Sequence, residues 1–151
     1  MKKLLKRRIG AVERVSIPEW GLHGVTAKID TGAFTSSIDI STVEVLTPRE
    51  GELPVAVIQM GEGKMRRTVT ASVVGFRRVR NSSGQATNRP IVEAVISLAG
   101  KRFRTPINLH RREGMTYRMI IGRRALAGRF VVDVARAWQR AREERRASQR
   151  R

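Results

Sequence analysis

Short segments rich in Val, Ile, Leu and Thr, each ended by Gly, Pro or polar residues, recur along most of this chain and limit the folds open to it. Segments 92–98 and 103–109 alternate apolar and polar residues on either side of Ala99-Gly100-Lys101, which predicts a β-hairpin. We expect further strands over residues 9–17, 25–29, 43–46, 55–60, 68–76 and 130–134, with a hairpin tip at 61–64. Many short strands and only one or two helices favour an all-β fold closed into a barrel.

The length of 151 residues suits one folded domain, which we place at residues 9–134. A basic lead-in, residues 1–8, precedes it. Residues 135–151 are rich in Ala, Arg, Gln and Glu, which favours a basic C-terminal helix or tail with Trp138 as its large apolar side chain. A short helix is also expected at residues 124–126.

Charge is the unusual feature of the composition. Thirty-one Lys and Arg oppose 13 Asp and Glu, which gives a formal net charge of +18 and a pI near 11.8. Such an excess attracts polyanions, so RNA, the ribosome or an acidic polypeptide are candidate partners, and a merely solvated basic surface is the alternative. Without cysteine, disulfides, thiolate catalysis and Cys-based zinc sites are excluded. No segment has the apolar run of a signal peptide or transmembrane helix, so we expect a cytoplasmic protein with no membrane partner.

The candidate catalytic group lies just after the strand expected at residues 25–29. That strand brings Asp30 to a tight turn, and Thr31 and Gly32 follow. Glycine suits a position where backbone approaches another group closely or φ is positive, and the Thr31 hydroxyl can bond to backbone and hold the turn rigid. Because Asp and Gly are common in turns, an ordinary turn also explains this tripeptide when it is taken alone.

A second stretch adds weight to the first. Met119-Ile120-Ile121-Gly122-Arg123 is an apolar run that ends in Gly-Arg and leads into the short helix. With Asp-Thr-Gly-Ala upstream, it resembles the paired signature of retropepsin-like aspartic proteases, in which such a segment lies behind the aspartate loop and supports it. Over residues 12–138 the chain resembles the RimK-associated retropepsin-like family, often labelled putative ATP-dependent zinc proteases. The segments that carry this resemblance are 27–37, 78–84, 89–92, 115–123 and 130–133.

The resemblance implies a retropepsin-like barrel and an aspartic peptidase. The implied site residues are Asp30, which would activate water, Thr31 and Gly32, which would shape the loop, and the supporting Ala33, Gly122 and Arg123. Such hydrolysis needs two carboxylates that share one proton, yet the chain has a single Asp-Thr-Gly. The second would be the partner's Asp30 in a two-fold homodimer. Within one chain, Asp39 and Asp133 are candidates by residue type, and an N-cap or ion-pair role suits Asp133 better.

Three features depart from the viral retropepsins. Phe34 stands where those enzymes commonly have an acidic residue that can pair with the arginine of Gly-Arg, so Arg123 lacks that partner. The chain is expected to end in a basic helix, whereas the viral enzymes dimerise partly through short terminal strands. The flap over the substrate could be residues 60–65 or 81–89.

The zinc and ATP of the family label find little support among the residues. The chain has only His23 and His110, far apart in sequence, and no His-Glu-x-x-His. Gly61 and Gly63 do not have the spacing of a phosphate-binding loop. We therefore expect no metal and no cofactor.

Arginines flank residues 81–89, which we expect to form a polar loop, and the second motif. They are Arg77, Arg78, Arg80, Arg89, Arg111, Arg112 and Arg118, of which Arg78, Arg80, Arg89 and Arg112 are the candidate substrate-binding residues. Because the neighbours of the resembled family include ligases that add glutamates to protein termini, an acidic peptide or an oligoglutamate-tailed protein is the implied substrate, and arginine forks suit carboxylates. Arginines scattered over a solvated surface are the alternative. The basic tail could contact RNA or the ribosome through phosphates.

Two function classes follow from these residues. The first is an aspartic-type peptidase that hydrolyses peptide bonds of an acidic substrate, possibly those of a glutamate tail. The alternative is a non-catalytic basic binding module of retropepsin fold that holds RNA, the ribosome or an acidic protein partner.

Overall fold

The computed structural model describes residues 5–111 and 114–137 of the chain. Arg112, Trp138 and nearly all of the expected C-terminal helix lie outside the described residues. The described beginning of that segment, residues 135–137, is a turn and not a helix, because the Asp133 carboxylate and carbonyl accept hydrogen bonds from the amides of Ala135 and Arg136.

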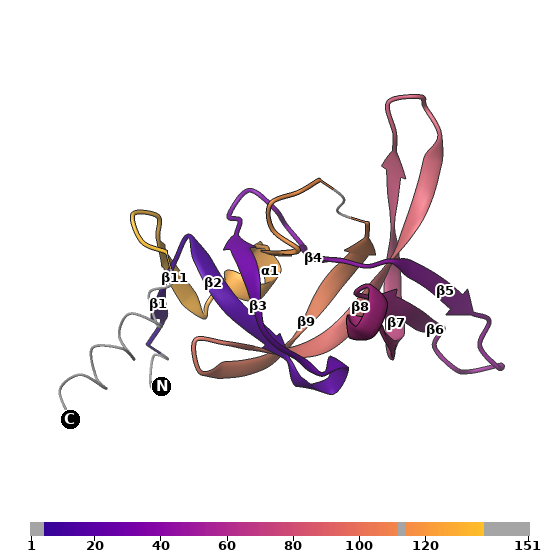
Figure 1. Cartoon of the computed structure of the whole chain (residues 1–151), viewed down its shortest axis with the longest axis horizontal. Coiled ribbons are helices and arrows are strands. Elements are labelled where there is room, and N and C mark those ends of the chain that lie inside the picture. Colours follow the sequence, from indigo (N-terminus) through magenta and orange to yellow (C-terminus); the bar gives the residue numbers. More distant parts are fainter. Residues whose placement is uncertain (1–4, 112–113, 138–151) are drawn as a thin grey trace.

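The described chain consists mainly of strands (Figure 1). In order, the elements are β1 (Arg7–Gly10), β2 (Val12–Ile17), the 3-10 helix η1 (Pro18–Trp20), β3 (Leu22–Ile29), β4 (Ser36–Asp39), β5 (Thr42–Leu46), β6 (Val55–Met60), the 3-10 helix η2 (Gly63–Met65), β7 (Arg67–Arg80), β8 (Ala86–Leu98), β9 (Lys101–His110), β10 (Met119–Ile121), α1 (Arg123–Leu126) and β11 (Phe130–Asp133). Across residues 5–111 and 114–137, no helix has the length and apolar character needed to cross a membrane.

Six strands close into a barrel in the order β2-β3-β10-β4-β9-β8, because β8 pairs with β2 as well as with β9. The β8–β9 hairpin predicted from the alternating pattern is confirmed, with Leu98 opposite Lys101. The pairs β3–β10 and β4–β9 are parallel. Closure leaves these strands without free edges. The predicted all-β, retropepsin-like barrel with one short helix is thus confirmed.

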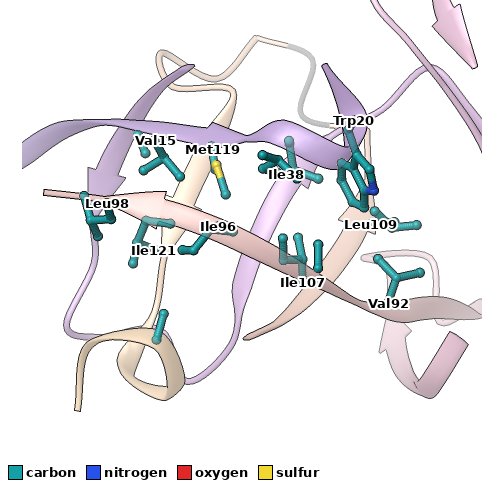
Figure 2. Packing of buried hydrophobic residues seen from close by; sticks show 14 of the residues in the cluster. Val15, Trp20, Ile38, Val92, Ile96, Leu98, Ile107, Leu109, Met119 and Ile121 are labelled. Atoms are coloured by element: carbon teal, nitrogen blue, oxygen red, sulfur yellow. The ribbon is translucent and has the colours of Figure 1, made fainter. Parts of the chain in front are cut away.

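Aliphatic side chains fill the barrel. On β8 every second residue points inward, and Val92, Ala94, Ile96 and Leu98 are at most 1% exposed. Figure 2 shows side chains of β9 and β10 meeting them, among them Ile107, Leu109, Met119 and Ile121. Each large aliphatic side chain buried in this way stabilises the fold by about 1.5–3 kcal/mol. The alternation also places the intervening residues, such as Ile91 of β8 and Asn108 of β9, on the face of the wall opposite the core, where Asn108 is nevertheless buried.

A second group of strands extends the sheet beyond β8 in the order β8-β7-β6-β5. The turn between β6 and β7 contains η2, which confirms the hairpin predicted around residues 61–64. Residues 76–80 of β7 and 86–90 of β8 pair only with one another. We call residues 76–90 the ribbon; it projects from the body of the molecule at the upper right of Figure 1.

The ribbon corrects one expectation. The polar loop placed at residues 81–89 is only residues 81–85, since Ala86 to Arg89 belong to β8. Asn81 closes the turn: its amide donates to the Gln85 carbonyl and its side chain accepts from the Gln85 amide. Polar residues such as Thr87 and Asn88 carry no apolar alternation, so only their pairing with β7 shows that they form a strand.

The two chain ends of the barrel also differ from expectation. The single strand expected at residues 9–17 is split into β1 and β2 at Ala11, and β1 begins at Arg7. β1 pairs in parallel with β11, Arg7 opposite Phe130 and Gly10 opposite Asp133. β11 confirms the last strand predicted at residues 130–134, and its parallel pairing with β1 was not predicted.

Candidate active site

Asp30 lies at the point where β3 leaves the barrel wall. The Asp30 amide donates to the Ile121 carbonyl at 2.9 Å, which extends the β3–β10 ladder to this residue. Its half-buried carboxylate accepts a hydrogen bond from the Gly32 amide at 3.0 Å through Oδ1. The Ala33 amide donates to the Asp30 carbonyl at 3.2 Å. These bonds fold residues 30–35, which we call the aspartate loop, tightly around the carboxylate.

The second motif holds this loop from behind. The amides of Arg123 and Arg124 donate to the carbonyls of Ala33 and Phe34, at 2.8 and 3.0 Å. The Gly122 amide donates to Ser36 Oγ at 3.0 Å in a buried position. Three successive amides at the start of α1 therefore bind the aspartate loop and the first residue of β4.

Glycine is required at position 122 because the backbone of residues 33–35 lies very close to it. A Cβ built on this residue would lie 2.8 Å from the Thr35 carbonyl carbon, 2.9 Å from the Ala33 oxygen and 3.0 Å from the Phe34 oxygen. All three are backbone atoms, which cannot turn aside as a side chain could. The contact explains why glycine precedes arginine in this motif.

The Arg123 side chain reaches the loop as well. It donates to the Thr31 carbonyl at 3.0 Å, and its guanidinium carbon lies 5.7 Å from the centroid of the Phe34 ring. Arg124 lies 5.6 Å from the same ring. Phe34 thus provides the face of an aromatic ring to two arginines at the position where viral enzymes commonly carry an acid. The sequence predicted the lost acidic partner of Arg123 but not this replacement.

We expect Phe34→Leu to lower the free energy of unfolding by about 1 kcal/mol, because each exposed cation–π contact contributes roughly 0.5–1 kcal/mol. Phe34 is 61% exposed, so little core packing is lost with the ring. Urea unfolding of both proteins measures the difference.

Phe76→Leu is the matched control for this change, since Phe76 is 52% exposed and no arginine of the described residues is recorded over its ring. Equal losses in the two variants would mean that the arginine contacts contribute nothing.

Both alternative acids of the same chain have recorded partners other than Asp30. Asp39 lies at the other end of β10: its amide bonds to the Arg118 carbonyl, and its carboxylate lies 3.9 Å from the Arg118 guanidinium. Asp133 accepts from the Ala135 amide at 3.1 Å and lies 3.4 Å from Arg136 Nε, which matches the capping and ion-pair role considered for it.

The donor set does not fit zinc. In the described part of the chain, no three His, Cys, Asp or Glu side chains gather closely enough to hold a metal ion. His23 is exposed on β3, whereas His110 ends β9, where Nδ1 lies 2.8 Å from the Arg111 carbonyl and Nε2 3.4 Å from Ser37 Oγ.

Of the two flap candidates, the turn at residues 60–65 lies beside the wrong end of β3. Met60, Gly61 and Met65 line a pocket of about 320 Å³ together with residues 21–25, at the start of that strand. Asp30 follows its other end, eight residues or roughly 25 Å away along an extended strand. A larger pocket of about 500 Å³ includes Leu53, Val74 and Glu93, and neither pocket is lined by residues 30–32. The ribbon is the remaining flap candidate within one chain.

The candidate substrate-binding arginines do not lie together. Arg89 pairs directly with Arg77 across the ribbon, while Arg78 and Arg80 are opposite Asn88 and Ala86. Arg78 and Arg80 are therefore on the opposite face of the ribbon from Arg89. Arg112 lies outside the described residues.

Two site features were missed from the sequence. Ser36, whose hydroxyl accepts from the Gly122 amide, and Arg124, which covers Phe34, were not assigned a role. A serine beside an aspartate loop could have suggested the first, because its hydroxyl can bond to nearby backbone.

Comparison with known proteins agrees with this geometry. The family model described as retropepsin-like aspartic endopeptidase RimB matches residues 8–143. Proteins named probable alpha-L-glutamate ligase match as well: that of Desulfotalea psychrophila is 33% identical over 135 residues, covering 87% of this chain and 29% of the ligase. That of Shewanella pealeana is 31% identical over 128 residues, covering 83% of this chain and 28% of the ligase. The chain thus spans less than a third of the length of these relatives.

A solved structure supports the fold. The crystal structure of a Legionella pneumophila protein of unknown function superposes with a TM-score of 0.74 at 23% identity, covering 89% of this chain and 98% of that one. At this identity the likeness concerns the fold alone. Together with the aspartate loop, the Gly-Arg segment behind it and the six-stranded barrel, the family match shows that the chain belongs to the RimB-like family of retropepsin-like aspartic endopeptidases.

Proposed function

We propose that this protein is an aspartic-type peptidase that works as a two-fold dimer and cuts peptide bonds of an acidic substrate. The observation that carries the proposal is the aspartate loop: one half-buried carboxylate, fixed by the Gly32 amide and backed by three amides of residues 122–124. The Gly32 amide binds the carboxylate itself, and the amides of residues 122–124 bind the Ala33 and Phe34 carbonyls and the Ser36 hydroxyl, so the loop that carries the acid is held in place. The family match supports the same chemistry.

The chemistry needs a second carboxylate, which the partner's Asp30 supplies in this proposal. Two carboxylates at hydrogen-bonding distance share one proton, because like charges that close cannot both ionise. The ionised member takes a proton from water, and the water oxygen attacks the peptide carbonyl carbon. The protonated member donates a hydrogen bond to the carbonyl oxygen, and the bond to nitrogen then breaks to release an acid and an amine.

Two observations favour glutamate-rich chains as the substrate. The formal net charge of +18 attracts an acidic polypeptide. The relatives named probable alpha-L-glutamate ligase contain a region similar to this chain, and a peptidase module in one polypeptide with such a ligase would act on the glutamates that the ligase handles. We therefore propose oligoglutamate tails of proteins as the substrate.

A subunit-mixing experiment tests the shared site. Wild-type protein and Asp30→Asn are combined at constant total concentration and allowed to exchange subunits, and cleavage of an eight-glutamate peptide is followed by mass spectrometry. If both acids of a dimer are needed, activity follows the square of the wild-type fraction, so an equal mixture retains about one quarter of it.

Dilution of the wild type with an unrelated protein is the control. The diluted wild type should retain half the activity, less any further loss due to dimer dissociation. An equal mixture with Asp30→Asn that retains half the activity would mean that each chain acts alone, and the dimeric mechanism would be wrong.

The binding module is the second candidate function. Arg77, Arg78, Arg80 and Arg89 of the ribbon have no recorded hydrogen bond or ion pair within the described part of the chain, which leaves them available to an anion such as RNA. In that case Asp30→Asn would leave the protein's binding and cellular role unchanged.

A further inference from the structure

The ribbon carries an arginine pair of unusual placement. Arg77 and Arg89 are direct partners in the β7–β8 ladder, whereas Arg78 is opposite Asn88 and Arg80 is opposite Ala86. Side chains directly opposite each other in an antiparallel pair have Cβ atoms about 5 Å apart, and like charges there are destabilising. Among the described residues neither guanidinium of the pair has a recorded ion pair or hydrogen bond to offset this repulsion.

Acids on the neighbouring outer strands are already engaged. The Glu93 carboxylate, also on β8, lies 4.0 Å from the Arg104 guanidinium. The Asp39 carboxylate lies 3.9 Å from that of Arg118. Within residues 5–111 and 114–137, no recorded ion pair places a carboxylate at either of these two adjacent positive charges. A carboxylate from another molecule would remove the repulsion and accept charge-assisted hydrogen bonds from both arginines.

The pair lies on the face of the sheet opposite the core. Val92 and Ala94 of β8 point into the core, so Arg89 and Ile91 point outward. Ile91 pairs with Asn108 of β9, Asn108 with Ser37 of β4, and Ser37 with Ile120 of β10. Asn108 and Ser37 are buried in this row, 2% and 7% exposed, and the row ends at Ile120, which is opposite Lys28, two residues before Asp30.

Arg78 and Arg80 are on the other side. They alternate with Arg77, so they share the face of the ribbon that carries Phe76 and Pro90. In Figure 1 the ribbon and the loop that joins β3 to β4 both rise from the same, upper side of the molecule. Three strand spacings, roughly 14 Å along the sheet, separate β8 from β10, and Arg89 lies two residues, roughly 7 Å, beyond Ile91 on β8. An extended peptide covers this path in about six residues.

We propose that Arg77 and Arg89 form an anion subsite that holds an acidic side chain of the substrate on its way to Asp30, and that Arg78 and Arg80 take no part in it. The inference rests on the proposed peptidase function and names the residues that determine its preference for acidic chains. The ligand is an extended acidic peptide, long enough to reach from the ribbon to the aspartate loop.

Two double variants test the proposal. Arg77→Gln/Arg89→Gln and Arg78→Gln/Arg80→Gln each remove two positive charges from the same ribbon and differ only in the face they alter. Binding of a fluorescent eight-glutamate peptide is measured by anisotropy at about 0.15 M salt, where charges further apart than roughly 8 Å are screened. Both are made in the Asp30→Asn protein, so that no cleavage occurs during the titration.

The expected result is a Kd about tenfold higher for Arg77→Gln/Arg89→Gln, because two guanidinium contacts are lost. The Kd for Arg78→Gln/Arg80→Gln should change by less than about twofold. In the protein with Asp30 intact, the first pair of substitutions should raise KM for the same peptide and leave kcat nearly unchanged. Removal of a like-charge pair should leave Tm unchanged or raise it, which checks that both variants fold.

Equal weakening by the two double variants would overturn the proposal, since it would mean that only net charge matters. A twenty-nucleotide single-stranded RNA provides the other contrary outcome: weaker RNA binding by Arg77→Gln/Arg89→Gln with unchanged peptide binding would assign the pair to nucleic acid. The two hypotheses fail separately. A peptide that binds through the pair but is never cleaved contradicts the peptidase, whereas cleavage that is insensitive to the pair contradicts only the subsite.

Discussion

Asp30→Asn should abolish peptide cleavage while the barrel stays folded. The amide cannot take a proton from water, and general acid–base catalysis of this kind accounts for roughly 10²–10⁴-fold in rate. The fold should persist because the Asn side-chain oxygen can still accept the hydrogen bond that Asp30 Oδ1 accepts from the Gly32 amide. The measurement is kcat/KM for the eight-glutamate peptide, with Tm recorded on the same samples.

Asp39→Asn is the matched control. It makes the same chemical change on an acid that lies at the other end of β10 and next to Arg118. We expect this variant to keep wild-type kcat/KM. Cleavage that survives Asp30→Asn would contradict the peptidase proposal, and loss of cleavage in Asp39→Asn would point to a second acid within one chain.

Gly122→Ala should have the largest effect on stability among small substitutions near the site. The φ and ψ of Gly122, −97° and 179°, are extended and open to any residue, so the cost is steric. The added Cβ would lie 2.8 to 3.0 Å from three backbone atoms of residues 33–35. Overpacking of this kind costs about 1–3 kcal/mol. In a chain of this size each kcal/mol lowers Tm by roughly 2–4 °C.

The same substitution should lower activity beyond its effect on folding. To make room for the Cβ, the aspartate loop must move away from α1, and a displacement of about 1 Å in a catalytic group can cost on the order of 100-fold in rate. Thermal unfolding and kcat/KM at a temperature where the variant is folded separate the two effects.

Gly75→Ala is the control for Gly122→Ala. A Cβ on Gly75 would meet no atom within 4 Å, and its φ is not positive. Alanine there should therefore be neutral or slightly stabilising. If the two variants showed the same Tm and activity, the close packing behind the aspartate loop would have no energetic consequence.

The fold was predictable wherever side-chain alternation was strong. Ile96 and Leu98 on one strand and Ile107 and Leu109 on the next gave their hairpin directly, because apolar residues at every second position must share a buried face. The ribbon was not predictable in this way. It has no core to face, so its polar residues carry no periodic signal and only the turn at residues 81–85 sets its register.

The residues of the site could be predicted from the sequence, but their contacts and relative positions could not. Asp30 and Gly122 could be paired through a family signature, but the contact between Gly122 and residues 33–35 joins segments almost ninety positions apart. The separation of Arg89 from Arg78 and Arg80 also depends on the register of the β7–β8 ladder. Composition reveals that arginines are numerous, and only strand pairing reveals which of them share a face.

The two ends of β8 are paired with different numbers of neighbouring strands. From Ile91 to Leu98 it is bonded to β9 and in part to β7 or β2, whereas from Ala86 to Pro90 it is bonded to β7 alone. A two-stranded hairpin is marginally stable in water, so the outer part opens at a much lower free energy than the barrel. β8 is therefore held by strands on both sides within the barrel, and by one strand in the ribbon. The ribbon end can therefore open while the end bonded to β9 keeps its place in the barrel wall.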